Sequence, residues 1–100
     1  MAILKLEKPV LINGEETNEI EYNFEDLTGA DMQAAVKELQ QHQLLTGVLE
    51  IDTNYQAAMF AQAAGLSFGD LANLKVRDYN NAVLLARNFL NAQSGQEEQE

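Results

Sequence analysis

The chain contains no cysteine and no tryptophan, and it has one proline and one histidine among its 100 residues. Without cysteine it can form no disulfide, no thiolate zinc site and no cysteine nucleophile. It also has no apolar run approaching the roughly 18 residues that a membrane-spanning helix needs. The first residues lack the basic and apolar regions of a signal peptide. We therefore expect a soluble cytoplasmic protein.

Basic residues are scarce as well: 6 lysines and arginines stand against 16 acidic residues, for a formal net charge of −10. Affinity for nucleic acid depends on cations that neutralise phosphates, and anionic membranes attract basic segments. The composition therefore argues against both partners. It favours solubility, or complementarity to a basic protein surface. A chain of this length makes one domain.

The N-terminal region is predicted to form a β-hairpin over residues 1–26. Asn13-Gly14 is a strong turn signal, because both central positions of a type I′ turn require positive φ. After the turn, Ile20, Tyr22 and Phe24 alternate with polar and acidic residues, as in a strand with one apolar face. Residues 15–18 fit either a longer loop or the start of this second strand. Pro9 has no N–H, which predicts a strand start or edge.

Residues 28–92 are predicted to form a small bundle of three to four helices. Thr28 and Ser67, each followed three residues later by an aspartate, predict helix starts, and Gly65 predicts a helix end. Asp52 or Thr53 is expected to cap the second helix, and the last helix is expected over residues 76–92. The fold class is therefore mainly α with an N-terminal β-hairpin (α+β), as a single domain over residues 1–92. Residues 93–100 are expected to be a disordered acidic tail.

Chemical motifs are mostly absent. Gly65–Gly69 matches the G-x-S-x-G pattern, but an alanine-rich helix precedes Ser67 where the hydrolase motif needs a strand. The single histidine, His42, precedes this serine and is expected to be solvent-exposed near a helix end. Asp78 is expected to be a first-turn helix residue. Phosphate-binding loops and calcium loops are missing. We therefore predict no catalytic, cofactor-binding or metal-binding residues, and no enzyme.

Aromatic residues and methionine offer candidates for binding a partner. Side chains of this kind at helical spacing are more often core, but they can also line a groove for a partner helix, and methionine adapts to irregular surfaces. The hairpin strand also needs a partner for its apolar face, either the helices or another chain. The candidate partner-binding residues are Tyr22, Phe24, Tyr55, Met59, Phe60 and Phe68.

Several segments resemble the phage tail assembly chaperones. At the start these are the extended Leu6–Ile12 with Lys-Pro-Val, the Asn13-Gly14 hairpin and Thr-Gly-Ala-Asp at residues 28–31. Near the end they are Gly65-Leu66-Ser67, Asp70-Leu71, Leu74, Asp78 and Phe89-Leu90. The order and spacing of these segments carry the resemblance, which covers about residues 5–91.

The resemblance implies a non-enzymatic phage or prophage factor that binds and shields the tape measure protein while the tail assembles. It also implies a homo-oligomer, and the strand at residues 20–24 is expected to take part because an unpaired edge can extend a sheet into a neighbouring subunit. The alternative is a small acidic regulator or DNA mimic that binds a basic protein. The host, the segment of the client that is bound, the subunit number, a frameshifted longer form and the structure of residues 40–52 are not determined by the sequence.

Overall fold

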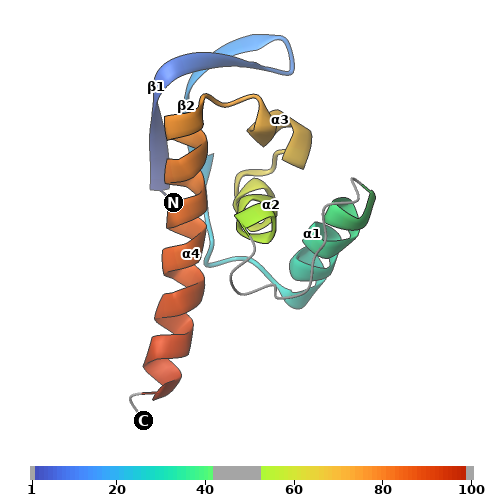
Figure 1. The fold of residues 1–100 in the computed structure, drawn as a ribbon, viewed down its shortest axis with the longest axis vertical. Helices are drawn as coiled ribbons and strands as arrows, with labels where there is room; N and C mark the ends of the chain where they lie inside the picture. The colour runs from blue at the N-terminus through green and yellow to red at the C-terminus, as the bar shows by residue number, and fades with distance from the viewer. Residues whose placement is uncertain (1, 42–52, 99–100) are drawn as a thin grey trace.

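The computed structural model describes residues 2–41 and 53–98. Within these two ranges an antiparallel hairpin at the N-terminus is followed by four helices, which confirms the predicted α+β fold class (Figure 1). The strands are β1 (Ala2–Ile12) and β2 (Glu15–Tyr22), and the helices are α1 (Gly29–Gln41), α2 (Thr53–Ala64), α3 (Phe68–Ala72) and α4 (Val76–Glu98). The predictions for His42 and Asp52 lie outside the described residues.

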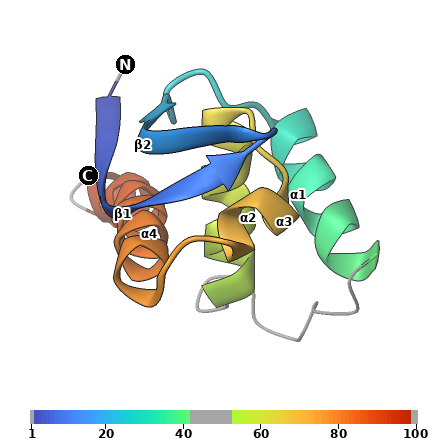
Figure 2. The same ribbon diagram turned by 90° about the horizontal axis from the view of Figure 1, so that it is seen from above.

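Helix α2 occupies the centre of the molecule, between α1 and α4, with the hairpin lying across their ends (Figures 1 and 2). All seven residues from 55 to 61 are buried, so α2 has no solvent-facing side over two turns. Its alanines allow the neighbouring helices to approach closely, and Phe60 fills the space between them with no exposed surface. Strand β1 packs on α4 and β2 packs on α2. The core therefore forms around α2, under the inner face of the hairpin.

The hairpin turn forms as predicted. Asn13 has φ 54° and Gly14 has φ 82°, the positive values that a two-residue type I′ turn requires. Leu4, Ile12 and Ile20 point into the core from the inner face of the two strands. Residues 15–18 belong to β2 rather than to a loop, whereas Phe24 lies beyond the end of this strand. The period of two therefore identified the correct inner face but overestimated the strand's length.

A bulge interrupts the middle of β1. Lys5 pairs with Glu19 and Val10 pairs with Thr17, so Leu6–Pro9 lie opposite the single residue Asn18. Such an irregularity leaves backbone groups unpaired and bends the strand. Pro9 lies inside the bulge, where its missing N–H removes no ladder hydrogen bond. The sequence predicts that Pro9 lies at a strand start or at a sheet edge. Pro9 lies inside β1 rather than at its start, but β1 is an edge strand of the two-stranded sheet that the described residues form, so the second alternative is confirmed.

Local helix signals operate as predicted. Thr28 and Asp31 exchange side-chain-to-backbone hydrogen bonds at 3.3 and 2.9 Å, and Ser67 and Asp70 form the same capping box before α3. Gly65 ends α2 with φ 71°. The N–H of Leu66 donates to the Ala61 carbonyl at 2.9 Å and that of Gly65 to the Gln62 carbonyl at 3.3 Å. This pair of bonds is a Schellman motif.

Helix α4 differs from its prediction in two respects. Its backbone continues to Glu98, beyond the predicted end at Ala92, because glutamine and glutamate favour helix and no proline stops it. The helical spacing of Val76, Tyr79, Val83, Ala86 and Leu90 predicts one apolar stripe along this helix, with Phe89 beside it. At the start of the helix, however, Val76 is 74% exposed. The buried residues of α4 include Ala82, Val83 and Ala86. That residues 93–100 form a tail separate from the domain stays a prediction.

Candidate partner-binding surface

The structure divides the six candidate binding residues into two groups. Tyr55, Met59, Phe60 and Phe68 are buried, with at most 6% of each residue exposed. They belong to the core around α2, so a partner could reach them only if the core opened. Tyr22 and Phe24 are half-buried and reach the surface. These two stay the accessible candidates.

Tyr22 and Phe24 belong to an aromatic cluster that links the hairpin to the helices. Phe24 stacks on Phe89 of α4 with ring centroids 4.9 Å apart and an angle of 15° between the ring planes. The ring centroid of Tyr22 lies 5.3 Å from that of Phe24 and 5.1 Å from that of Phe60. Phe89 was not among the predicted binding residues. Its place beside the apolar stripe of the last helix was the only signal in the sequence.

Two adjoining hollows follow β2 where it meets the end of α2, each with a volume of about 400 Å³. Both are lined by Glu21 and Ala64. We call them together the β2 groove; its remaining lining residues are Ile12, Thr17, Glu19, Ile20 and Leu66 in one hollow and Tyr22, Asn23, Gln62, Ala63 and Gly65 in the other. The groove therefore combines apolar and small residues with two glutamates, and it includes the candidate Tyr22.

The β2 groove lies in the most acidic part of the chain. Residues 9–36 contain seven acidic residues and no lysine or arginine. On β2 itself, the four glutamates are all exposed: Glu15, Glu16, Glu19 and Glu21. Of these, Glu19 and Glu21 line the groove. The charge of this surface is therefore complementary to that of a cationic protein segment.

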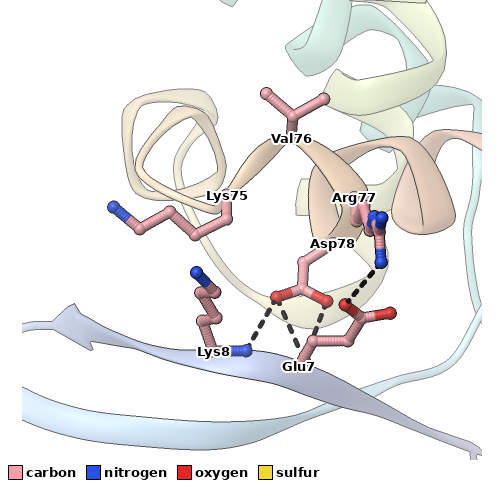
Figure 3. Close-up of a pocket in the computed structure, with 6 residues that line it drawn as sticks. All are labelled: Glu7, Lys8, Lys75, Val76, Arg77 and Asp78. Carbon is pink, nitrogen blue, oxygen red and sulfur yellow. Dashed lines mark hydrogen bonds and ion pairs between the residues drawn. The ribbon is translucent and has the colours of Figure 1, made fainter.

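A third hollow, also of about 400 Å³, lies where the bulge of β1 meets the start of α4 (Figure 3). Asp78, which has no exposed surface, accepts the Glu7 N–H on both carboxylate oxygens, at 2.9 and 3.1 Å. Its Oδ2 also accepts the Lys8 N–H at 3.3 Å. The carboxylate thus satisfies backbone donors that the bulge removes from the sheet. Asp78 is a first-turn residue as predicted, but its partners on β1 could not be predicted.

Basic residues surround this corner. Lys8, Lys75 and Arg77 are three of the chain's six basic residues, and all three line the hollow. Arg77 lies 3.7 Å from Glu7, with both side chains largely exposed, so this ion pair contributes little. Since the Asp78 carboxylate is already bonded to backbone N–H groups, we interpret the corner as a structural joint between β1 and α4.

The described residues present no group of histidine and acidic side chains that could hold a metal ion. Ser67 acts as a helix cap, since its hydroxyl oxygen accepts the Asp70 N–H at 3.0 Å. This accounts for the serine of the G-x-S-x-G pattern. No helix in the described ranges is long and apolar enough to cross a membrane.

Comparison with known proteins identifies the family. The family model described as phage tail assembly chaperone proteins, E, or 41 or 14, matches residues 4–91. No curated protein and no solved structure gives a significant match. The matched region begins at Leu4 in β1. It includes β2, α1, α2 and α3 in full, and it ends at residue 91 within α4. A chaperone family implies a non-enzymatic role and a tail protein as partner. The chain belongs to the family of phage tail assembly chaperones.

Proposed function

We propose that this protein binds the tape measure protein of a tailed phage or prophage in the host cytoplasm, and that it shields this client until the tail assembles around it. The observation that carries the proposal is the family match over residues 4–91. This span includes the aromatic cluster and the β2 groove, so the surfaces available to a client belong to the part that matches the family.

The surface chemistry is consistent with this role. The family resemblance implies that the client is long and hydrophobic. Such a client must be kept from aggregating, which requires apolar contacts with the chaperone and charge on the surface that stays exposed. Tyr22 and Phe24 offer half-buried aromatic rings, and Leu84 and Leu11 are 47% and 65% exposed. The net charge of −10 would keep a coated client soluble.

Co-expression with the tape measure protein of the same phage tests the proposal. The tagged chaperone is expected to retain the tape measure protein on affinity resin and to increase its soluble fraction. The major tail tube protein of the same phage, expressed in the same way, serves as the control client. Retention of neither protein, or of the tube protein alone, would refute tape measure binding while leaving the family assignment intact.

A further inference from the structure

We propose that the β2 groove binds an extended client segment in which lysines or arginines alternate with apolar residues, and that this segment adds to β2 as a third strand. The inference rests on the proposed chaperone function and names the site and the chemistry of the client segment. Three observations support it: an unpaired strand edge, a hollow beside that edge, and a one-sided distribution of charge.

The first observation is the free edge of β2. Within the described residues the sheet contains only β1 and β2, so the outer edge of β2 faces no third strand. Beyond the end of β2, the Asn23 N–H donates to the Ala63 carbonyl at 3.0 Å, which holds the strand beside α2. An unpaired edge offers backbone N–H and C=O groups in the spacing that an extended peptide needs.

The second observation is the shape and composition of the β2 groove. Along β2, Ile20 is 5% exposed and lies on the inner face, whereas its neighbours Glu19 and Glu21 are exposed. On the other side of the groove lie Ala64 and Leu66. Because side chains alternate along a strand, an added strand would place every second residue over Ala64 and Leu66 and the others beside the glutamates. The residues over Ala64 and Leu66 would therefore be apolar, and the residues beside the glutamates would be lysine or arginine.

The third observation is the charge of β2, which also indicates whether the third strand comes from a client or from a second copy of the chain. Two β2 edges placed side by side would bring glutamates of both copies together, and like charges in adjacent strands are destabilising. Strand β1 is the extended segment of this chain that carries lysines, and its Lys5 already pairs with Glu19. A third strand supplied by this chain is therefore disfavoured, and a basic client segment fits better.

A pair of charge reversals on the same strand tests the inference. Glu19→Lys/Glu21→Lys changes the groove, whereas Glu15→Lys/Glu16→Lys makes the same change in net charge on exposed residues that do not line it. The probes are overlapping synthetic peptides that span the tape measure protein, with binding measured by fluorescence anisotropy. We expect the tightest peptide to alternate basic and apolar residues. Its affinity should fall about tenfold or more for the groove variant and less than about threefold for the control.

Three further measurements make the test specific. A peptide with its cations replaced by glutamate should bind the Glu19→Lys/Glu21→Lys variant better than it binds the unchanged protein. Ala64→Phe, which fills the groove without changing charge, should also weaken the original peptide. Strand addition should slow amide hydrogen exchange within β2 when the peptide binds. Circular dichroism checks that each variant is folded.

The outcomes separate this inference from the proposed function. If the groove variants retain the tape measure protein and the peptide as well as the unchanged protein does, the groove inference is wrong and the function stands. Equal losses for both charge-reversal pairs would indicate general attraction to an acidic surface and would also overturn it. If the unchanged protein retains no tape measure protein, the proposed function itself fails.

Discussion

Glu7 and Asp78 lie 71 positions apart in the chain, yet the Glu7 N–H donates to both carboxylate oxygens of Asp78, at 2.9 and 3.1 Å. The bulge in β1 frees this N–H from the sheet, and the start of α4 supplies the acceptor (Figure 3). A two-stranded hairpin is only marginally stable by itself. This contact therefore fixes the hairpin to the helices at the middle of β1, while the aromatic cluster fixes it at the end of β2.

Replacing Asp78 with alanine should lower the free energy of unfolding by about 2–3 kcal/mol, because the Glu7 and Lys8 N–H groups lose a charged acceptor. Urea denaturation followed by circular dichroism measures this loss. Glu25→Ala removes the same charge from an exposed side chain and should change stability by less than about 0.5 kcal/mol. Equal stability of the two variants would show that the carboxylate does not hold the hairpin.

Phe89→Ala should lower the free energy of unfolding by about 2 kcal/mol. The sequence alone predicts about 3–5 kcal/mol for a fully buried phenylalanine, but Phe89 is half-buried and stacks on Phe24. Phe60→Ala, at a residue with no exposed surface, should show the larger loss. A double-mutant cycle of Phe24→Ala and Phe89→Ala should give a coupling of about 1 kcal/mol. Strictly additive losses would argue against the stacked pair.

Gly65→Ala should lower stability by about 1 kcal/mol, because Gly65 has φ 71° and a Cβ is strained in that region. No atom within 4 Å would obstruct the new methyl group, so the loss would come from the backbone. Gly69→Ala is the matched control: it lies inside α3, where alanine favours the helix and its Cβ would meet the Ser67 hydroxyl oxygen at an ordinary 3.7 Å. Thermal melts should show a lower midpoint only for the first variant.

Removal of residues 94–100 should leave the melting temperature unchanged. These residues carry three glutamates and no large apolar side chain, so they have little apolar surface to bury. Soluble expression and thermal melts of the chain ending at Gln93 measure this. A substantial fall in either would show that the end of α4 supports the domain.

Self-association should increase as salt rises, because the ten net negative charges of each copy oppose contact and are screened by added ions. From the sequence, the strand at residues 20–24 is expected to take part, but the exposed glutamates of β2 oppose contact between two β2 edges. We therefore expect the outer face of β1 to be the surface involved, since Ile3 and Leu11 are 50% and 65% exposed there. Sedimentation velocity at low and high salt measures the change. Leu11→Ser should weaken association, while Met32→Ser on α1 should not. A strict monomer at high protein concentration in both salts would exclude the oligomer.

Short-range patterns in the sequence determined much of the local structure. Asn13-Gly14, the Thr28–Asp31 and Ser67–Asp70 pairs, and Gly65 all formed the predicted turn, caps and helix end. Each depends on backbone geometry and on hydrogen bonds between residues a few positions apart, so the surrounding fold had little influence. The order of segments was also sufficient to suggest the family, which the match over residues 4–91 confirms.

Tertiary structure alone decided which of these elements meet and which side chains stay accessible. Nothing in the spacing of residues indicated that Asp78 accepts hydrogen bonds from the bulge of β1, or that Glu38 on α1 accepts the Phe68 N–H at 2.8 Å before α3. The sequence could not separate the buried Phe60 from the half-buried Phe24, since both are aromatic residues in apolar patterns. Burial depends on packing between distant segments, and periodicity within one segment carries no information about its neighbours.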